Sequence, residues 1–118
     1  MNEKGTKMMN KSLNLPQPID AYFTADKGDS EAVGKCFTDN AVVKDEGNTY
    51  NGLAAIKQWK IDSSNKYTYT CVPFACEEKD GITMVTSRVE GNFPGSPVDL
   101  RYFFTLEGNK ISSLEVIL

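Results

Sequence analysis

The carboxylates are the side chains of this sequence best suited to move protons, and Asp45 is the foremost candidate. It ends a short apolar run and opens the segment Asp45-Glu46-Gly47-Asn48. A carboxylate where a strand meets an apolar pocket would have its pKa raised by desolvation, as a base working near neutrality requires. The alternative is a turn aspartate that hydrogen-bonds its own loop, which suits this residue type equally well. The residues alone leave both interpretations open.

A second pair of groups that could do chemistry is Asp99 and Arg101, two positions apart in a predicted strand. Residues at this spacing share one face of a strand. If that face lines a pocket, the two side chains could act as an acid–base and anion-holding pair. If it faces solvent, they form an exposed salt bridge that contributes very little to stability.

The sequence contains no histidine, which removes the commonest general base, the usual zinc ligand and the Ser–His and Cys–His nucleophile pairs. Its three cysteines, Cys36, Cys71 and Cys76, form no Cys-x-x-Cys motif. If Cys71 and Cys76 share a strand, their odd spacing points them to opposite faces, so they cannot bind one metal together. We therefore expect buried free thiols, no metal site and no cofactor.

Composition indicates one folded domain outside the nucleic-acid-binding and membrane classes. The chain has 118 residues, 40% of them hydrophobic and 25% charged, which suits a single domain with a buried core. Its net charge is −3 and its lysines are spread along its length, which argues against nucleic acid as a partner. No apolar run approaches the roughly 20 residues that span a bilayer. Residues 1–15 lack the apolar core of a secretory signal and are expected to form a loosely ordered leader, so we expect a cytoplasmic protein.

Three helices are predicted before position 66, from apolar residues that recur at spacings of three and four. The first begins near Pro16 and Pro18 and ends at Lys27-Gly28, the second is short and follows Asp29 or Ser30, and the third carries Leu53, Ile56 and Trp59. Tyr22 and Trp59 lie on helix faces that should look toward a sheet, as core and pocket wall.

Strands are predicted over 41–43, 66–76, 82–93, 98–106 and 111–118, where β-branched and aromatic residues alternate between turn sequences. Helices gathered before a meander of strands indicate an α+β fold with the helices on one sheet face. The other face, which we expect to carry Tyr67, Tyr69 and Cys71, is then left for a partner, which favours a homodimer. The predicted core consists of Phe23, Val33, Phe37, Ile56, Trp59, Val85, Val89 and Phe104.

Two local motifs resemble the nuclear transport factor 2-like superfamily, which includes the SnoaL-like and ketosteroid isomerase-like proteins. Phe37-Thr38-Asp39-Asn40-Ala41-Val42-Val43-Lys44-Asp45 is similar to the family's phenylalanine-to-aspartate stretch, and Gly52 followed by Ala55-Ile56 and Trp59 is similar to the start of its next helix. The resemblance covers roughly 19–118 and implies a cone-shaped, cystatin-like α+β fold: three N-terminal helices packed in a curved antiparallel sheet around a pocket, here one domain over 16–118. It also implies a homodimer.

The ketosteroid isomerase branch permits a comparison residue by residue. The resemblance places the general base at Asp45. The tyrosine that stabilises the oxyanion in that branch corresponds to a position one residue from Tyr22, a difference of about 100° of helix rotation. The neutral aspartic acid of that branch corresponds to Asp99 or Arg101. The resemblance thus implies catalysis by Asp45 with Tyr22, Asp99 or Arg101 stabilising an oxyanion.

The superfamily combines enzymes with non-catalytic modules, so its fold does not decide function. We expect a small apolar ligand contacted by Trp59, Phe23, Phe37 and Phe104. Three functions fit: an isomerase, lyase or cyclase acting on a small apolar carbonyl compound, a non-catalytic pocket for a hydrophobic ligand, or a dimerisation module. A pocket that contains Asp45 and a nearby donor would favour the enzyme, whereas a wholly apolar pocket would favour binding alone.

Overall fold

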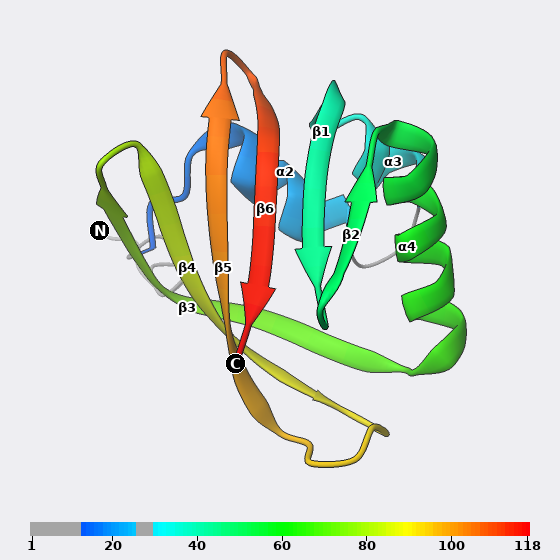
Figure 1. Ribbon diagram of the computed structural model, residues 1–118. Helices are drawn as coiled ribbons and strands as arrows, with labels where there is room; N and C mark the ends of the chain where they lie inside the picture. Colours follow the sequence, from blue (N-terminus) through cyan, green and yellow to red (C-terminus); the bar gives the residue numbers. More distant parts are fainter. Residues whose placement is uncertain (1–12, 26–29) are drawn as a thin grey trace, which may run out of the picture.

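The computed structural model describes residues 13–25 and 30–118, so most of the predicted leader and the helix end at Lys27-Gly28 lie outside the described residues. Within them the chain forms three helices, α2 (Gln17–Ala25), α3 (Ser30–Gly34) and α4 (Leu53–Lys66). Figure 1 shows these helices beside a strongly curved sheet, with α2 packed on the sheet and α4 near the edge formed by β1 and β2. None of the helices described is long and apolar enough to cross a membrane.

Helix α4 is placed against the sheet by the residue that precedes it. Gly52 has φ +86°, a left-handed conformation that glycine adopts without the steric cost of a Cβ atom. Its N–H donates to the carbonyl oxygen of Ala41 at 2.8 Å, which ties the start of the helix to β1. Ile56, Trp59 and Lys60 form the buried face of the helix that results.

The sheet has six strands: β1 (Phe37–Asp45), β2 (Asn48–Asn51), β3 (Tyr69–Lys79), β4 (Ile82–Gly91), β5 (Val98–Glu107) and β6 (Lys110–Ile117). Their order across the sheet is β2-β1-β6-β5-β4-β3. The predicted antiparallel meander of four strands is confirmed, and with it the α+β class. One pair departs from the expected pattern, because β1 runs parallel to β6.

The first half of the sheet differs from the sequence prediction in two respects. Strand β1 begins at Phe37 rather than Ala41, and its pairing with β6 is irregular between Phe37 and Val42, where the sequence is polar. Strand β2 was not predicted, because its four residues are mostly polar and resemble a turn. It forms through a two-residue hairpin at Glu46 and Gly47, both of which have positive φ, as a tight hairpin turn requires.

A bulge in β3 overturns the prediction that Cys71 and Cys76 face opposite ways. Cys71 lies opposite Val89 and Cys76 opposite Val85, both of them buried, and the register shifts between Pro73 and Ala75. An extra residue restarts the alternation of side chains, so an odd spacing returns to the same face. The predicted outer face was also wrong, because Tyr67 and Tyr69 line an inner pocket and Cys71 is buried in the core.

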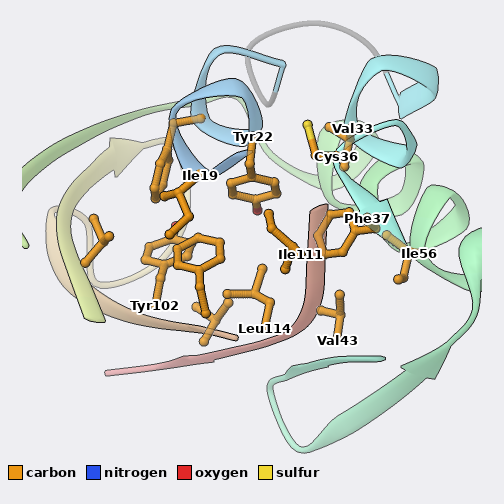
Figure 2. Close-up of a cluster of buried hydrophobic side chains, with 14 of the residues drawn as sticks. Ile19, Tyr22, Val33, Cys36, Phe37, Val43, Ile56, Tyr102, Ile111 and Leu114 are labelled. Carbon is orange, nitrogen blue, oxygen red and sulfur yellow. The ribbon is translucent and has the colours of Figure 1, made fainter. Parts of the chain in front are cut away.

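The hydrophobic core is confirmed at every predicted position. Figure 2 shows side chains from α2, among them Ile19 and Tyr22, pointing toward Ile111, Leu114 and Tyr102 of the strands. Aromatic rings meet mainly edge to face in this core, a favourable arrangement of their quadrupoles. The eight predicted residues that are buried are Phe23, Val33, Phe37, Ile56, Trp59, Val85, Val89 and Phe104.

The outer face of the sheet carries exposed apolar side chains at positions other than those predicted. Val72 on β3 is 57% exposed and Ile82 on β4 is 41% exposed. The exposed apolar residues of the outer face are therefore Val72 and Ile82, not Tyr69 and Cys71. The homodimer itself stays a prediction.

Candidate functional site

A cavity of about 650 Å³ lies between α4 and the inner face of the sheet, and its wall is mostly apolar with a few polar groups. This volume suits a small organic ligand. The residues with polar groups that line it include Asp45, Tyr22, Lys60, Tyr69 and Tyr102, together with Trp59. The apolar residues that line it include Val89, Phe93, Val98, Leu100 and Val116.

Asp45 reaches the cavity from the end of β1, and Trp59 holds it there. The indole Nε1–H of Trp59 donates to Asp45 Oδ2 at 2.9 Å. Burial raises the pKa of Asp45, an effect that the hydrogen bonds from Trp59 and from the backbone of Glu46 partly oppose. The carboxylate thus lines the cavity and also bonds its own turn, so both alternatives from the sequence describe part of its surroundings.

Two of the phenols that line the cavity with Asp45 are almost completely buried. Tyr22 on α2 is only 2% exposed, and burial raises its pKa well above the ordinary value. Tyr102 on β5 is similarly buried, with its pKa raised mainly by desolvation and its hydroxyl 3.5 Å from the Cys71 thiol. Both side chains remain protonated near neutrality and are therefore hydrogen-bond donors. Tyr22, one of the donors expected from the sequence, thus lines the cavity, while its role as a donor stays a prediction.

Lys60 is a polar residue of the site that sequence reasoning missed. Its side chain is 4% exposed, and its Nζ donates to the hydroxyl of Tyr69 at 3.1 Å. The same Nζ lies 5.0 Å from the centre of the Trp59 ring, within the range of a cation–π contact. Burial lowers the pKa of Lys60 to about 8. A signal was available, because Lys60 follows Ile56 by four residues and therefore falls on the apolar face of its helix.

Asp99 and Arg101 require a correction, because they lie on the sheet face opposite the cavity. Strand β5 lines the cavity with Val98, Leu100 and Tyr102, so the residues between them point outward. The register of β4 with β5 places Arg88 opposite Asp99, and Arg88 Nε donates to Asp99 Oδ1 at 2.7 Å.

The outward pair therefore belongs to the surface. Arg101 donates from Nη2 to the carbonyl oxygen of Leu118 and does not pair with Asp99. The exposed salt bridge considered from the sequence exists, with Arg88 as its cation in place of Arg101. Neither Asp99 nor Arg101 is part of the site.

Of the four residues predicted to contact a ligand, one lines the cavity and three do not. Trp59 lines the cavity, as predicted. Phe23, Phe37 and Phe104 pack in the core behind it, where other side chains cover them.

Metal ligands do not gather in the part of the chain that the structure describes. No group of three or more histidine, cysteine, aspartate or glutamate side chains is placed there to hold an ion. The charged and polar residues of the cavity are instead two carboxylates, Asp45 and Glu46, two lysines, Lys60 and Lys66, and several phenols.

No protein-family model and no curated protein matches this chain, whereas solved structures do. It is similar to a candidate polyketide cyclase from Sinorhizobium meliloti, with 36% identity over 87% of this chain and 95% of the other, and a TM-score of 0.84. A Catenulispora acidiphila protein with a ketosteroid isomerase-like fold, in complex with trimethylamine, shares 18% identity over 89% and 87% of the two chains, with a TM-score of 0.79. The epoxide hydrolase/cyclase-like enzyme SalBIII, which has a role in pyran ring formation in the polyether salinomycin, shares 22% identity over 85% of this chain and 86% of its own, with a TM-score of 0.72.

Proposed function

Because the chain belongs to the nuclear transport factor 2-like superfamily, we propose that its cavity receives a small, mostly apolar carbonyl compound and that Asp45 is the general base. The reaction class is isomerisation, elimination or ring closure. Each of these begins when a base removes an acidic C–H proton next to the carbonyl group. The similarity to a candidate polyketide cyclase supports this class of substrate.

The observation that carries the proposal is the placement of the Asp45 carboxylate. It lines a cavity of about 650 Å³ and is oriented by the Trp59 indole at 2.9 Å. A carboxylate whose pKa is raised by burial is a stronger base than an exposed one. The hydrogen bond from the Trp59 indole partly opposes this rise in the pKa of Asp45, because it stabilises the ionised carboxylate.

The phenols supply the second half of the reaction. When the C–H proton passes to Asp45, the electron pair of that bond moves toward the carbonyl oxygen and an enolate forms. A neutral donor aimed at this oxygen stabilises the developing charge. Tyr22 and Tyr102 are buried, protonated and on the same cavity wall, so either can donate. Return of the proton from Asp45 to another carbon gives isomerisation. Departure of a leaving group with its electron pair, followed by transfer of the Asp45 proton to that group, gives elimination. Attack of the enolate carbon on a second carbonyl closes a ring, and the oxygen of that carbonyl takes the proton from Asp45.

Proton exchange tests the base without knowledge of the natural substrate. The probe is 2-tetralone, an apolar ketone with acidic C–H bonds, and its exchange of hydrogen for deuterium in D₂O is followed by proton NMR. We expect the protein to accelerate exchange and Asp45→Asn, which removes the proton acceptor at nearly constant volume, to lower the rate by about 10²-fold or more. Asp99→Asn is the matched control, because it makes the same change on the outer face. Equal rates for the wild type and Asp45→Asn would refute the assignment.

Binding without chemistry is the second candidate function. It is favoured by the hydrogen bonds that already engage Asp45, from the Trp59 indole and the backbone of Glu46. If the cavity binds 2-tetralone but exchange proceeds at the rate of the buffer, this function replaces the enzyme. If it does not bind at all, a dimerisation module is left.

A further inference from the structure

A buried cation shares the cavity with Asp45. Lys60 lines the cavity wall and is 4% exposed, so its charge is removed from bulk water. Burying an ammonium group is expensive unless other groups compensate for lost hydration. Tyr69 accepts a hydrogen bond from it and the Trp59 ring lies beneath it, at 3.1 Å from Nζ to the hydroxyl and 5.0 Å from Nζ to the ring centre.

A neighbouring lysine shows that burial is not the usual arrangement on this helix. Lys66, which also lines the cavity, is exposed, and its Nζ lies 5.4 Å from the centre of the Tyr67 ring. A lysine stem can cover apolar surface while its ammonium group stays in water, as Lys66 does. Lys60 instead directs its ammonium group inward, between two aromatic rings of the cavity wall.

We propose that Lys60, positioned by Tyr69, binds an anionic oxygen of the ligand. This inference rests on the proposed function, and it narrows the ligand to compounds that combine an apolar or aromatic body with a carboxylate or an enolised carbonyl group. The walls suit both parts, because Val89, Val98 and Leu100 face the same space as the ammonium group.

The arrangement around Trp59 gives the ligand a direction. The indole N–H contacts Asp45, while the face of the ring contacts Lys60. A ligand against this ring has its acidic C–H toward the carboxylate and its oxygen toward the ammonium group. Lys60 then stabilises the negative oxygen of the enolate directly. The sequence suggested this role for Asp99 or Arg101, but both lie on the opposite face of the sheet. Tyr69 is a positioning residue, because it acts through the hydrogen bond that orients Lys60.

Two probes of nearly the same shape test this site. They are 2-naphthoate, an aromatic carboxylate, and 2-naphthamide, its neutral counterpart, with binding measured by isothermal titration calorimetry at pH 7. A hydrogen bond to a charged partner changes affinity by about tenfold to a hundredfold. We expect the wild type to bind the carboxylate at least about tenfold more tightly than the amide.

The variants assign that preference to one lysine. Lys60→Met keeps an unbranched stem and should weaken binding of 2-naphthoate by about tenfold or more, with binding of 2-naphthamide nearly unchanged. Lys66→Met removes the exposed lysine of the same cavity and should keep the preference. Tyr69→Phe should weaken carboxylate binding less than Lys60→Met does.

The outcomes separate this inference from the proposed function. Equal binding of the two probes by the wild type, or a preference that survives Lys60→Met, overturns the Lys60 site and leaves the apolar cavity in place. A wild type that binds neither probe counts against the cavity as a ligand site and overturns both. If Lys60→Met does not fold, the relative affinity of the wild type for 2-naphthoate and 2-naphthamide decides whether the cavity holds an anion site.

Discussion

Replacing Lys60 with methionine should make the protein more stable near neutral pH. Methionine has an unbranched stem of similar length and carries no charge, so it fills the space of the buried lysine without its ammonium group. The folded protein holds the Lys60 proton less well than the unfolded chain does, because burial lowers the pKa of this group. Below the folded pKa the wild type therefore folds with a charged group under a desolvation penalty, which the variant lacks.

The size of the effect follows from the pKa. The ordinary value is 10.5 and the folded value about 8, a difference of about 2.5, which at about 1.4 kcal/mol per pKa unit penalises the folded state by about 3 kcal/mol at pH 7. For a pKa lowered by folding, the unfolded chain binds more protons between the two values, so wild-type stability rises with pH in this window. The penalty falls to about 1.5 kcal/mol at pH 9.5.

The variant also loses the hydrogen bond from Lys60 to Tyr69, which is worth about 1 kcal/mol. The net gain in the free energy of unfolding is then about 2 kcal/mol at pH 7 and about 0.5 kcal/mol at pH 9.5. Urea denaturation followed by far-ultraviolet circular dichroism at the two pH values measures both numbers. Lys66→Met is the control, because an exposed lysine should change stability by less than about 0.5 kcal/mol.

One result would refute this reasoning. If Lys60→Met is less stable than the wild type at pH 7 by an amount that does not depend on pH, then the surroundings of Lys60 compensate its burial completely. The ammonium group would then be a stabilising element of the fold, and the pKa of Lys60 would not be lowered.

Two further predictions concern Asp45 and the outer sheet face. Trp59→Phe removes the indole hydrogen bond that favours ionised Asp45, so the pKa of this carboxyl should rise above its wild-type value in a carbon-13 NMR titration; an unchanged or lower pKa would contradict the assigned bond. If the protein is a homodimer through the outer face, light scattering should give twice the 13.1 kDa of one chain. Val72→Lys should then return the mass to one chain, and a wild-type mass of 13.1 kDa would exclude this dimer.

Much of the fold could be predicted because its signals are local. The spacing of Leu53, Ile56 and Trp59 defines the buried face of α4, and the apolar residues of β4 to β6 alternate between clear turns. The placement of Asp45 followed from its position at the end of an apolar strand, together with a family motif. These features depend on residues within a few positions of one another, so one sequence is enough to find them.

The errors arose where the answer depends on distant partners. Asp99 and Arg101 were correctly placed on one face of a strand, but which face looks inward depends on how β5 pairs with β4 and β6. The facing of Cys76 depends on a bulge that only the pairing with β4 reveals. Lys60 was missed for another reason, since a charged residue is expected at the surface and its position on an apolar helix face was outweighed by its type.

The parallel pairing of β1 with β6 has a consequence for how the protein folds. Strand β6 lies between two groups of strands, β2-β1 on one side and β5-β4-β3 on the other, and these groups share no edge without it. During synthesis β1 and β2 are made early, but they have no strand to join until residues 110–117 follow. The sheet is therefore completed through contacts between residues that are distant in sequence. Topologies of this kind fold slowly, because a long loop must be ordered before its contacts form. Ile111 and Leu114, buried in β6, stand at the junction on which completion of the sheet depends.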